Sequence, residues 1–295
     1  MNDYTVAVDI IDIYGREYRV SGPGMGLQNV ELGLSPEGLL DGPVTTLWQE
    51  TAFGWGAYYA GLRYNKRELV LLFNILGDDA RHWYEVETGF RRGWSYTKDC
   101  TIRVTSESGV RELKVRLSEH TKTSMERDPR LRGFSGMVLT CVAGWPFWVG
   151  EDITREWELV SGTSGSGFFD PITNDTDMPM YAKYSLDVPG RWTLDDRSYG
   201  NDEFGRAEED WDRTLPFPLL TVGQDATVDA DPTEETLMCD DAAQRWGDLD
   251  GEDLLYPIPP GETVSIPISV TNASPGAAAQ LRLSRNYQRM WGIVG

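Results

Sequence analysis

The feature that most constrains the fold of this chain is the frequency of turn-forming residues between short apolar runs. Its 295 residues include 31 glycines and 16 prolines, set among β-branched residues and 33 aromatic ones (11 Trp, 13 Tyr and 9 Phe). In the second half, short strand-like runs are separated by Asp, Asn, Pro and Gly at intervals of roughly 8–12 residues. This spacing is typical of antiparallel β-sandwiches and jelly rolls. We therefore predict a mainly β fold.

The charge of the chain is distributed unevenly. Residues 1–150 carry 17 Lys and Arg against 19 Asp and Glu, whereas residues 151–295 carry 10 against 28. A length near 300 residues suits one large domain or two ordinary ones of roughly 100–200 residues each. Because the change in charge falls near the middle, next to Gly144-Trp145-Pro146, we predict two domains, 1–145 and 146–295.

Composition argues against several classes of protein. A net charge of −20 argues against a protein that grips nucleic acid by its phosphates, since such proteins present a basic face. No stretch approaches 18 consecutive apolar residues and the N-terminal residues lack a signal-peptide pattern, so we expect no membrane insertion. Three cysteines, Cys100, Cys141 and Cys239, have neither zinc-finger nor redox spacing, which indicates a reducing compartment.

The first half contains the clearest local patterns. Residues 69–76 form the most apolar run and predict a strand buried on both faces. A helix is expected over 79–88, with Asp78 and Asp79 at its start and Gly89 as a stop signal. Residues 101–106 and 112–117 predict a β-hairpin. In the second half, the run 161–167 is rich in Gly and Ser and predicts a flexible connection.

Residues suited to catalysis or metal binding are sparse. The two histidines, His82 and His120, lie in no nucleophile or metal motif, and there is no G-x-S-x-G, H-E-x-x-H or P-loop sequence. The acidic run 248–253 resembles the start of an EF-hand loop, but its glycine is misplaced and the terminal Glu is missing. We therefore expect no catalytic residues, no cofactor and no metal, and the chain is not expected to be an enzyme.

Two alternatives stay open. Acid pairs in the second half could reach the spacing that glycoside hydrolysis uses, although a solvated surface is the simpler explanation. Tryptophans could stack on sugars or fill the core of a sandwich; the candidates are Trp145, Trp148, Trp192 and Trp211.

Segment 118–134 differs from its surroundings because it is polar, mixed in charge and without an apolar period. It is either a long exposed loop or an arm that becomes ordered against a neighbouring subunit, since long loops in compact domains are usually functional. Its candidate intersubunit residues are Lys122, Arg127, Arg130 and Arg132.

Several sequence runs together resemble a known family. In the C-terminal third these are Val228–Pro232, Leu255–Pro260, Ser274–Ala277 and Leu283–Gly292; in the first half they are Gly38–Pro43 and Arg67–Leu76, followed by the helix and hairpin described above. The former resemble minor tail proteins of long-tailed actinobacterial phages. The latter resemble the distal tail proteins of siphophages.

The resemblance implies a fold and an assembly. It implies an N-terminal β-sandwich with one helix that forms a hexameric ring, and a C-terminal galectin-like jelly roll outside that ring. The ring would join the tail tube protein to the tail-tip hub and anchor fibre or receptor-binding proteins, and DNA would pass through its lumen without specific binding. The protein would be a structural part of the virion at the distal end of the tail, assembled in the host cytoplasm.

Charge is consistent with this division of roles. The near-neutral first half can pack around a ring without strong self-repulsion, whereas the acidic second half is better placed at the periphery. The alternative function is a carbohydrate-binding tail protein, in which the acidic, Trp-rich second half contacts the host cell wall.

Overall fold

The computed structural model describes residues 6–125, 128–241 and 245–292. The chain separates into two compact units. The first comprises the residues up to Gly150 together with the segment that begins at Tyr287, and the second comprises Glu151–Asn286. Nothing in the local sequence pattern indicated that the chain returns to the first unit at its C-terminal end.

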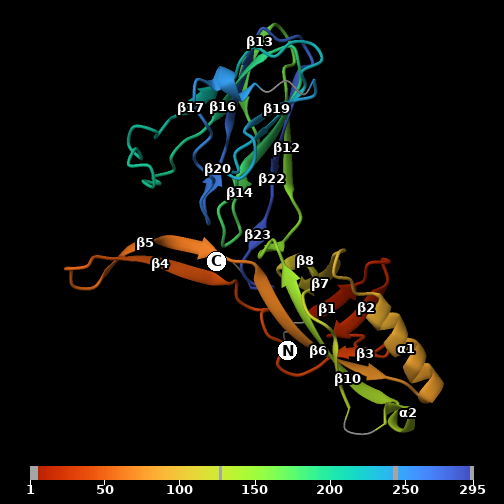
Figure 1. Ribbon diagram of the computed structural model, residues 1–295. Coiled ribbons are helices and arrows are strands. Elements are labelled where there is room, and N and C mark those ends of the chain that lie inside the picture. The colour runs from red at the N-terminus through yellow and green to blue at the C-terminus, as the bar shows by residue number, and fades with distance from the viewer. Residues whose placement is uncertain (1–5, 126–127, 242–244, 293–295) are drawn as a thin grey trace. The chain divides into compact units, whose positions relative to one another are not determined.

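The first unit is built on one ten-stranded sheet, in which the strand order is β2-β1-β7-β8-β10-β6-β3 (Figure 1). β9 pairs with β10, and β11 pairs with both β8 and β23. The strands are β1 (Ala7–Ile11), β2 (Glu17–Ser21), β3 (Val30–Leu32), β6 (Arg67–Leu76), β7 (Cys100–Ser106), β8 (Gly109–Leu117), β9 (Lys122–Ser124), β10 (Phe134–Ala143), β11 (Trp148–Val149) and β23 (Asn286–Tyr287).

The two longest strands of this sheet, β6 and β10, pair antiparallel along ten residues. On β6, alternate residues from Leu69 to Ile75 are buried, while those between them are half-buried. The expectation that this run is buried on both faces is therefore wrong: one face of β6 belongs to the core, and the other is only partly covered. The predicted hairpin is present as β7 and β8, joined through Glu107-Ser108.

A single long helix, α1 (Ala80–Arg92), packs on this sheet. Asp79 is its N-cap and accepts a hydrogen bond from the backbone N–H of His82, as the sequence pattern predicts. The helix continues through Gly89 and ends at Gly93, so the expected stop at Gly89 is wrong. It continues because the following turn buries Phe90, whose ring lies 5.0 Å, centroid to centroid, from that of Phe73 in β6.

The second unit consists of two antiparallel sheets and a separate strand pair. One sheet has the order β12-β22-β15-β18-β19, the other β13-β21-β16-β17, and β14 pairs with β20. The strands are β12 (Ile153–Glu158), β13 (Ser164–Phe168), β14 (Ile172–Thr173), β15 (Ala182–Leu186), β16 (Arg191–Asp195), β17 (Thr214–Pro216), β18 (Ala226–Asp229), β19 (Leu237–Cys239), β20 (Thr263–Val264), β21 (Pro267–Thr271) and β22 (Ala278–Leu283); a 3₁₀ turn, η1 (Trp246–Leu249), follows β19.

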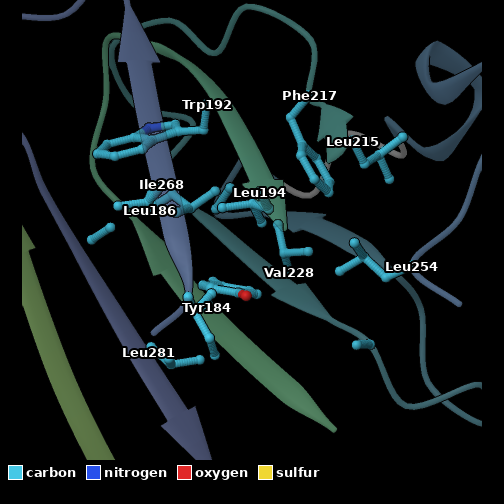
Figure 2. Close-up of a cluster of buried hydrophobic side chains, with 14 of the residues drawn as sticks. Tyr184, Leu186, Trp192, Leu194, Leu215, Phe217, Val228, Leu254, Ile268 and Leu281 are labelled. Atoms are coloured by element: carbon cyan, nitrogen blue, oxygen red, sulfur yellow. The ribbon is translucent and has the colours of Figure 1, made fainter. Parts of the chain in front are cut away.

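Side chains from both sheets of the second unit form one core (Figure 2). Trp192 and Leu194 of β16 meet Tyr184 and Leu186 of β15 there, and each is no more than 2 % exposed. Two sheets that share an apolar layer form a β-sandwich. The mainly β fold with sandwich architecture that the sequence predicts is therefore confirmed.

The expectation that residues 161–167 form a flexible connection is wrong, because Ser164–Phe168 is strand β13, paired with β21. Its glycines are needed for close packing rather than for flexibility. A Cβ atom at Gly167 would lie 2.2 Å from Nε1 of Trp157. The indole of Trp157 in turn packs edge-on against Trp192 in the core, with ring centroids 5.9 Å apart.

Candidate functional site

The most exposed apolar feature of the described chain is a β-hairpin in the first unit. Its strands are β4 (Val44–Glu50) and β5 (Ala57–Tyr64), and in Figure 1 they extend away from the sheet of that unit. Every residue of β4 is exposed, and so is every residue of β5 except Gly61 and Tyr64, which are half-buried. β4 and β5 pair with each other and with no other strand in the described part of the chain.

The backbone of the hairpin is specified by local residues. Gly56, at φ +80°, adopts a left-handed conformation at the turn that L side chains rarely adopt. The register shifts between Leu47 and Trp48, where β5 contains one extra residue next to Gly61. Gly61 has φ +131°, and such a bulge strengthens the local twist. The hairpin is thus a defined structural element of the first unit.

Aromatic side chains cover this hairpin. Trp48 and Tyr59 are directly opposite each other, with ring centroids 5.6 Å apart, and Trp48 Nε1 donates to the hydroxyl of Thr46 at 3.0 Å. The exposed aromatic side chains, with their exposed fractions, are Trp48 (57 %), Phe53 (101 %), Trp55 (102 %), Tyr58 (71 %) and Tyr59 (56 %). The charged residues of 44–64 are Glu50 and Arg63, so the hairpin is neutral in a chain of net charge −20.

An apolar two-stranded hairpin of this kind is an unusual surface. A solitary hairpin is marginally stable in water, and its open strand edges readily pair with other chains. Large contiguous apolar patches on a protein surface usually mark a binding site. We therefore identify the hairpin, residues 44–64, as the candidate interaction surface of the protein. The sequence pattern missed it because aromatic residues on both strands give no contrast between a buried and an exposed face.

The segment proposed from sequence as an arm, 118–134, has structure of its own. Lys122 begins β9, is exposed, and lies 3.7 Å from the carboxylate of Glu119. Arg130 and Arg132 lie in a four-residue helix, α2 (Pro129–Arg132), and are exposed. Arg127 lies outside the described residues. The intersubunit role of these four residues stays a prediction.

α2 is capped by its own residues at one end and bonded to another part of the first unit at the other. Asp128 caps it and pairs with Arg130 at 2.7 Å, an interaction that holds the pKa of the Asp128 carboxyl below its usual value. At the other end the carbonyl of Gly133 accepts from the backbone N–H of Gly77 at 2.8 Å. Along the part that the structure describes, the segment therefore contains a short strand and a short helix.

The structure places His82 among short-range polar contacts of the first unit. His82, in α1, hydrogen-bonds Asn29 at 3.3 Å and pairs with Asp78 at 3.2 Å. Across residues 6–125, 128–241 and 245–292, no three His, Cys, Asp or Glu side chains gather in a way that could hold a metal ion. None of the described helices has the length and apolar character needed to cross a membrane.

The four tryptophans considered as a sugar platform are divided between core and surface. Trp148 and Trp192 are fully buried, and each indole N–H donates to a main-chain carbonyl, that of Leu39 and that of Asp187 respectively. Trp145 and Trp211 are 50 % and 71 % exposed, and they lie in different units. These four residues thus form no shared platform within either unit.

Buried acids of the second unit organise a loop between β16 and β17. Asp196 accepts hydrogen bonds from the backbone N–H groups of Leu255 and Tyr256, at 2.8 and 3.0 Å, and forms an ion pair with Arg213. Asp210 accepts from the Tyr256 hydroxyl at 2.7 Å. These carboxylates accept hydrogen bonds from main-chain and phenol donors and thereby stabilise the loop.

Comparison with known proteins gives relatives along almost the whole chain. Minor tail protein Gp27 of Mycobacterium phage L5 and Minor tail protein Gp27 of Mycobacterium phage D29 are each 25 % identical to it, over 97 % of this chain and 98 % of the relative. No protein-family model matches.

Among solved structures, the crystal structure of the SPP1 Dit (gp 19.1) protein, described as a paradigm of the hub adsorption apparatus in phages that infect Gram-positive bacteria, shares the fold. The TM-score is 0.55 and the sequence identity 11 %, over 94 % of this chain and 98 % of that one. The chain is therefore similar, over nearly its full length, to minor tail proteins of mycobacteriophages, and the resemblance drawn from its sequence is confirmed.

Proposed function

We propose that this protein is a structural component of a phage tail tip, and that it forms a hexameric ring between the tail tube and the tail-tip hub. The similarity to minor tail proteins along 97 % of the chain supports the tail role. The observation that supports the proposal of a ring is the exposed aromatic hairpin 44–64. An apolar hairpin that is uncovered in one subunit needs a partner surface, and a second copy of the chain supplies one.

A ring is the assembly that such a hairpin favours. A hairpin that projects from one face of a subunit contacts a different face of its neighbour, which makes the interface heterologous. Heterologous contacts form a ring when the rotation from one subunit to the next adds up to a full turn without translation, and otherwise they produce filaments. The number six and the place at the distal end of the tail come from the family resemblance stated above.

Charge supports the roles of the two units. The first unit, with Arg289 added by its returning segment, carries 18 basic and 19 acidic residues, whereas the second carries 9 and 28. Subunits of the near-neutral unit can pack closely, while units of net charge −19 repel each other within a Debye length of roughly 8 Å at physiological salt. We therefore assign ring closure to the first unit, and attachment of fibre or receptor-binding proteins to the second.

The lumen of such a ring has to let DNA pass. A basic lumen would retain the phosphates of the DNA by counterion release. The first unit is close to neutral, which suits passage without specific binding. No catalytic step is needed for any part of this role, in line with the expectation that the protein is not an enzyme.

Native mass spectrometry of the purified full chain tests the proposal. The proposal predicts a dominant species of six subunits. This species should be more abundant at 0.5 M than at 0.05 M salt, because salt screens the repulsion between the second units. A chain that stays monomeric at micromolar concentration in both salts would contradict the ring.

A second candidate function is binding of host cell-wall glycans. The observation that favours it is a hollow of about 560 Å³ on the second unit, lined by polar side chains that include Glu156, Ser185 and Gln280. Wall glycans in a pull-down would then bind the wild type and not a Glu156→Ala, Gln280→Ala double variant. Absence of binding by the wild type would remove this candidate and leave the structural role.

A further inference from the structure

The segment Tyr287–Gly292, here called the closing segment, lies in the first unit although the whole second unit precedes it in the chain. Tyr287 and Met290 are 2 % and 4 % exposed, while Arg289 and Trp291 between and beyond them lie on the surface. Its first residue, Tyr287, is the second residue of β23, the strand that pairs with β11 of the first unit. The closing segment is therefore packed into the first unit rather than trailing from it.

Arg111, in β8, holds the main chain of this segment. The side chain is 4 % exposed, and its two terminal nitrogens donate to the carbonyls of Arg289 and Gly292, each at 2.8 Å. Its guanidinium also lies over the ring of Tyr287, 3.7 Å from the centroid. A cation on an aromatic face and charge-assisted bonds to carbonyls are both strengthened by burial.

Arg67, the first residue of β6, is a second buried cation that uses this segment. It is 1 % exposed and donates to the carbonyls of Gly38 (3.0 Å), Leu39 (3.1 Å) and Pro146 (2.7 Å), and to that of Gln288 at 2.6 Å. Burial lowers the pKa of Arg67 to about 10. Three of these acceptors come from the first 150 residues, and the fourth arrives only with the closing segment.

A buried guanidinium is costly unless its donors are satisfied. Before the closing segment is in place, Arg111 lacks both of the carbonyls named above, and Arg67 lacks one of its four. The core position of Tyr287 is vacant at the same stage. The first unit therefore cannot reach the packed state described here until the chain has passed through the second unit and returned.

From these contacts we propose that docking of Tyr287–Gly292 is the step that completes the first unit, and that it makes the subunit competent to assemble. The second half of this proposal rests on the ring function proposed above. The surface that receives the closing segment is formed by Arg67 and Arg111 of the first unit, and its occupant is the closing segment of the same chain. A chain interrupted before Tyr287 would fold its second unit and fail to join the ring.

The test uses the full chain with a specific protease site inserted between the exposed Ser284 and the half-buried Arg285, in the connection that precedes β23. After cleavage, native mass spectrometry measures whether the released piece stays bound. The variants are Arg111→Met and Tyr287→Leu. The matched control is Arg289→Ala, which keeps the carbonyl that Arg111 uses and removes only an exposed pair with Asp41.

We expect the cleaved wild type and the Arg289→Ala control to retain the segment. Arg111→Met should release it at least about 10-fold faster, since each lost bond from a charged donor contributes strongly to binding. Tyr287→Leu, which leaves every carbonyl in place, should be released faster by a smaller factor. Immediate release from the cleaved wild type would overturn the proposal, and this result does not depend on how well any variant folds. Equal retention of the segment by Arg111→Met and Arg289→Ala would also overturn it.

The same samples separate this inference from the ring itself. If the uncleaved wild type is monomeric but its cleaved form keeps the segment, the ring proposal fails and the closing role stands. If the uncleaved wild type forms a ring that persists after the segment has dissociated, the ring stands and the closing role is wrong.

Discussion

The tip of the hairpin offers the sharpest perturbation of the proposed interface. Phe53 and Trp55 are fully exposed in the subunit, so replacing both with serine should leave its stability within about 0.5 kcal/mol of the wild type. An aromatic side chain that is covered on assembly buries about 150–250 Å². At roughly 25 cal/mol per Å² this is a gross gain of about 4–6 kcal/mol for each ring.

Not all of this gain appears as affinity, because association and side-chain ordering oppose it. Truncation of aromatic hot spots commonly costs about 2 kcal/mol or more. We therefore expect the Phe53→Ser, Trp55→Ser double variant to weaken each contact between subunits by at least about 3 kcal/mol, which is about 100-fold in the dissociation constant.

Sedimentation velocity over a range of concentrations measures this shift, and thermal unfolding followed by circular dichroism checks the subunit. Trp211→Ser is the matched control, because Trp211 is also an exposed tryptophan, at 71 %, but belongs to the second unit. Assembly of the double variant at the wild-type concentration would refute the assignment of the hairpin. So would a fall in subunit stability as large as the fall in assembly.

Three further predictions concern the folded subunit. Trp192→Ala should destabilise the second unit by about 3–5 kcal/mol, because it removes a fully buried indole; a loss below 1 kcal/mol in urea unfolding would show that the site is not a packed core. Cys100 and Cys141 are buried, and burial raises the pKa of each thiol to about 12. A thiol-specific chromogenic reagent at pH 8 should therefore leave both unmodified in the native protein and modify both in denaturant; rapid native labelling would contradict their burial. The backbone N–H of His82 lowers the pKa of Asp79 below 3.8. Its stabilising contribution should be present above about pH 4 and be lost as the pH falls through the folded-state pKa. The difference in melting temperature between wild type and Asp79→Ala should therefore shrink below pH 3.8, and a gap that widens there would show the reverse sign.

Local patterns predicted the elements whose residues interact with near neighbours. The hairpin of β7 and β8 has clear strand runs on both sides of a turn, and the cap at Asp79 lies next to the helix that it begins. In these cases the partner of each residue is a few positions away, so the sequence pattern and the structure contain the same information. The strand rhythm of the second half likewise predicted a sandwich without giving the pairing of its strands.

The features on which the proposals rest could not be predicted in this way. The hairpin of β4 and β5 contacts little of its own subunit, so its residues show no buried face. The returning segment is held by Arg67 and Arg111 through main-chain carbonyls. Any residue supplies a carbonyl, and these acceptors lie far along the chain from the cations that bind them. Similarly, the sequence around Gly167 predicts flexibility, whereas in the structure the absence of a Cβ atom at Gly167 makes room for the indole of Trp157.

Electron microscopy of the purified full chain, with class averages sorted by symmetry, tests the central claim most directly. The account predicts closed rings of six subunits, with the near-neutral first units in continuous contact around the lumen and the acidic second units outside. Open filaments, rings held together through the second units, or isolated subunits at micromolar concentration would contradict it.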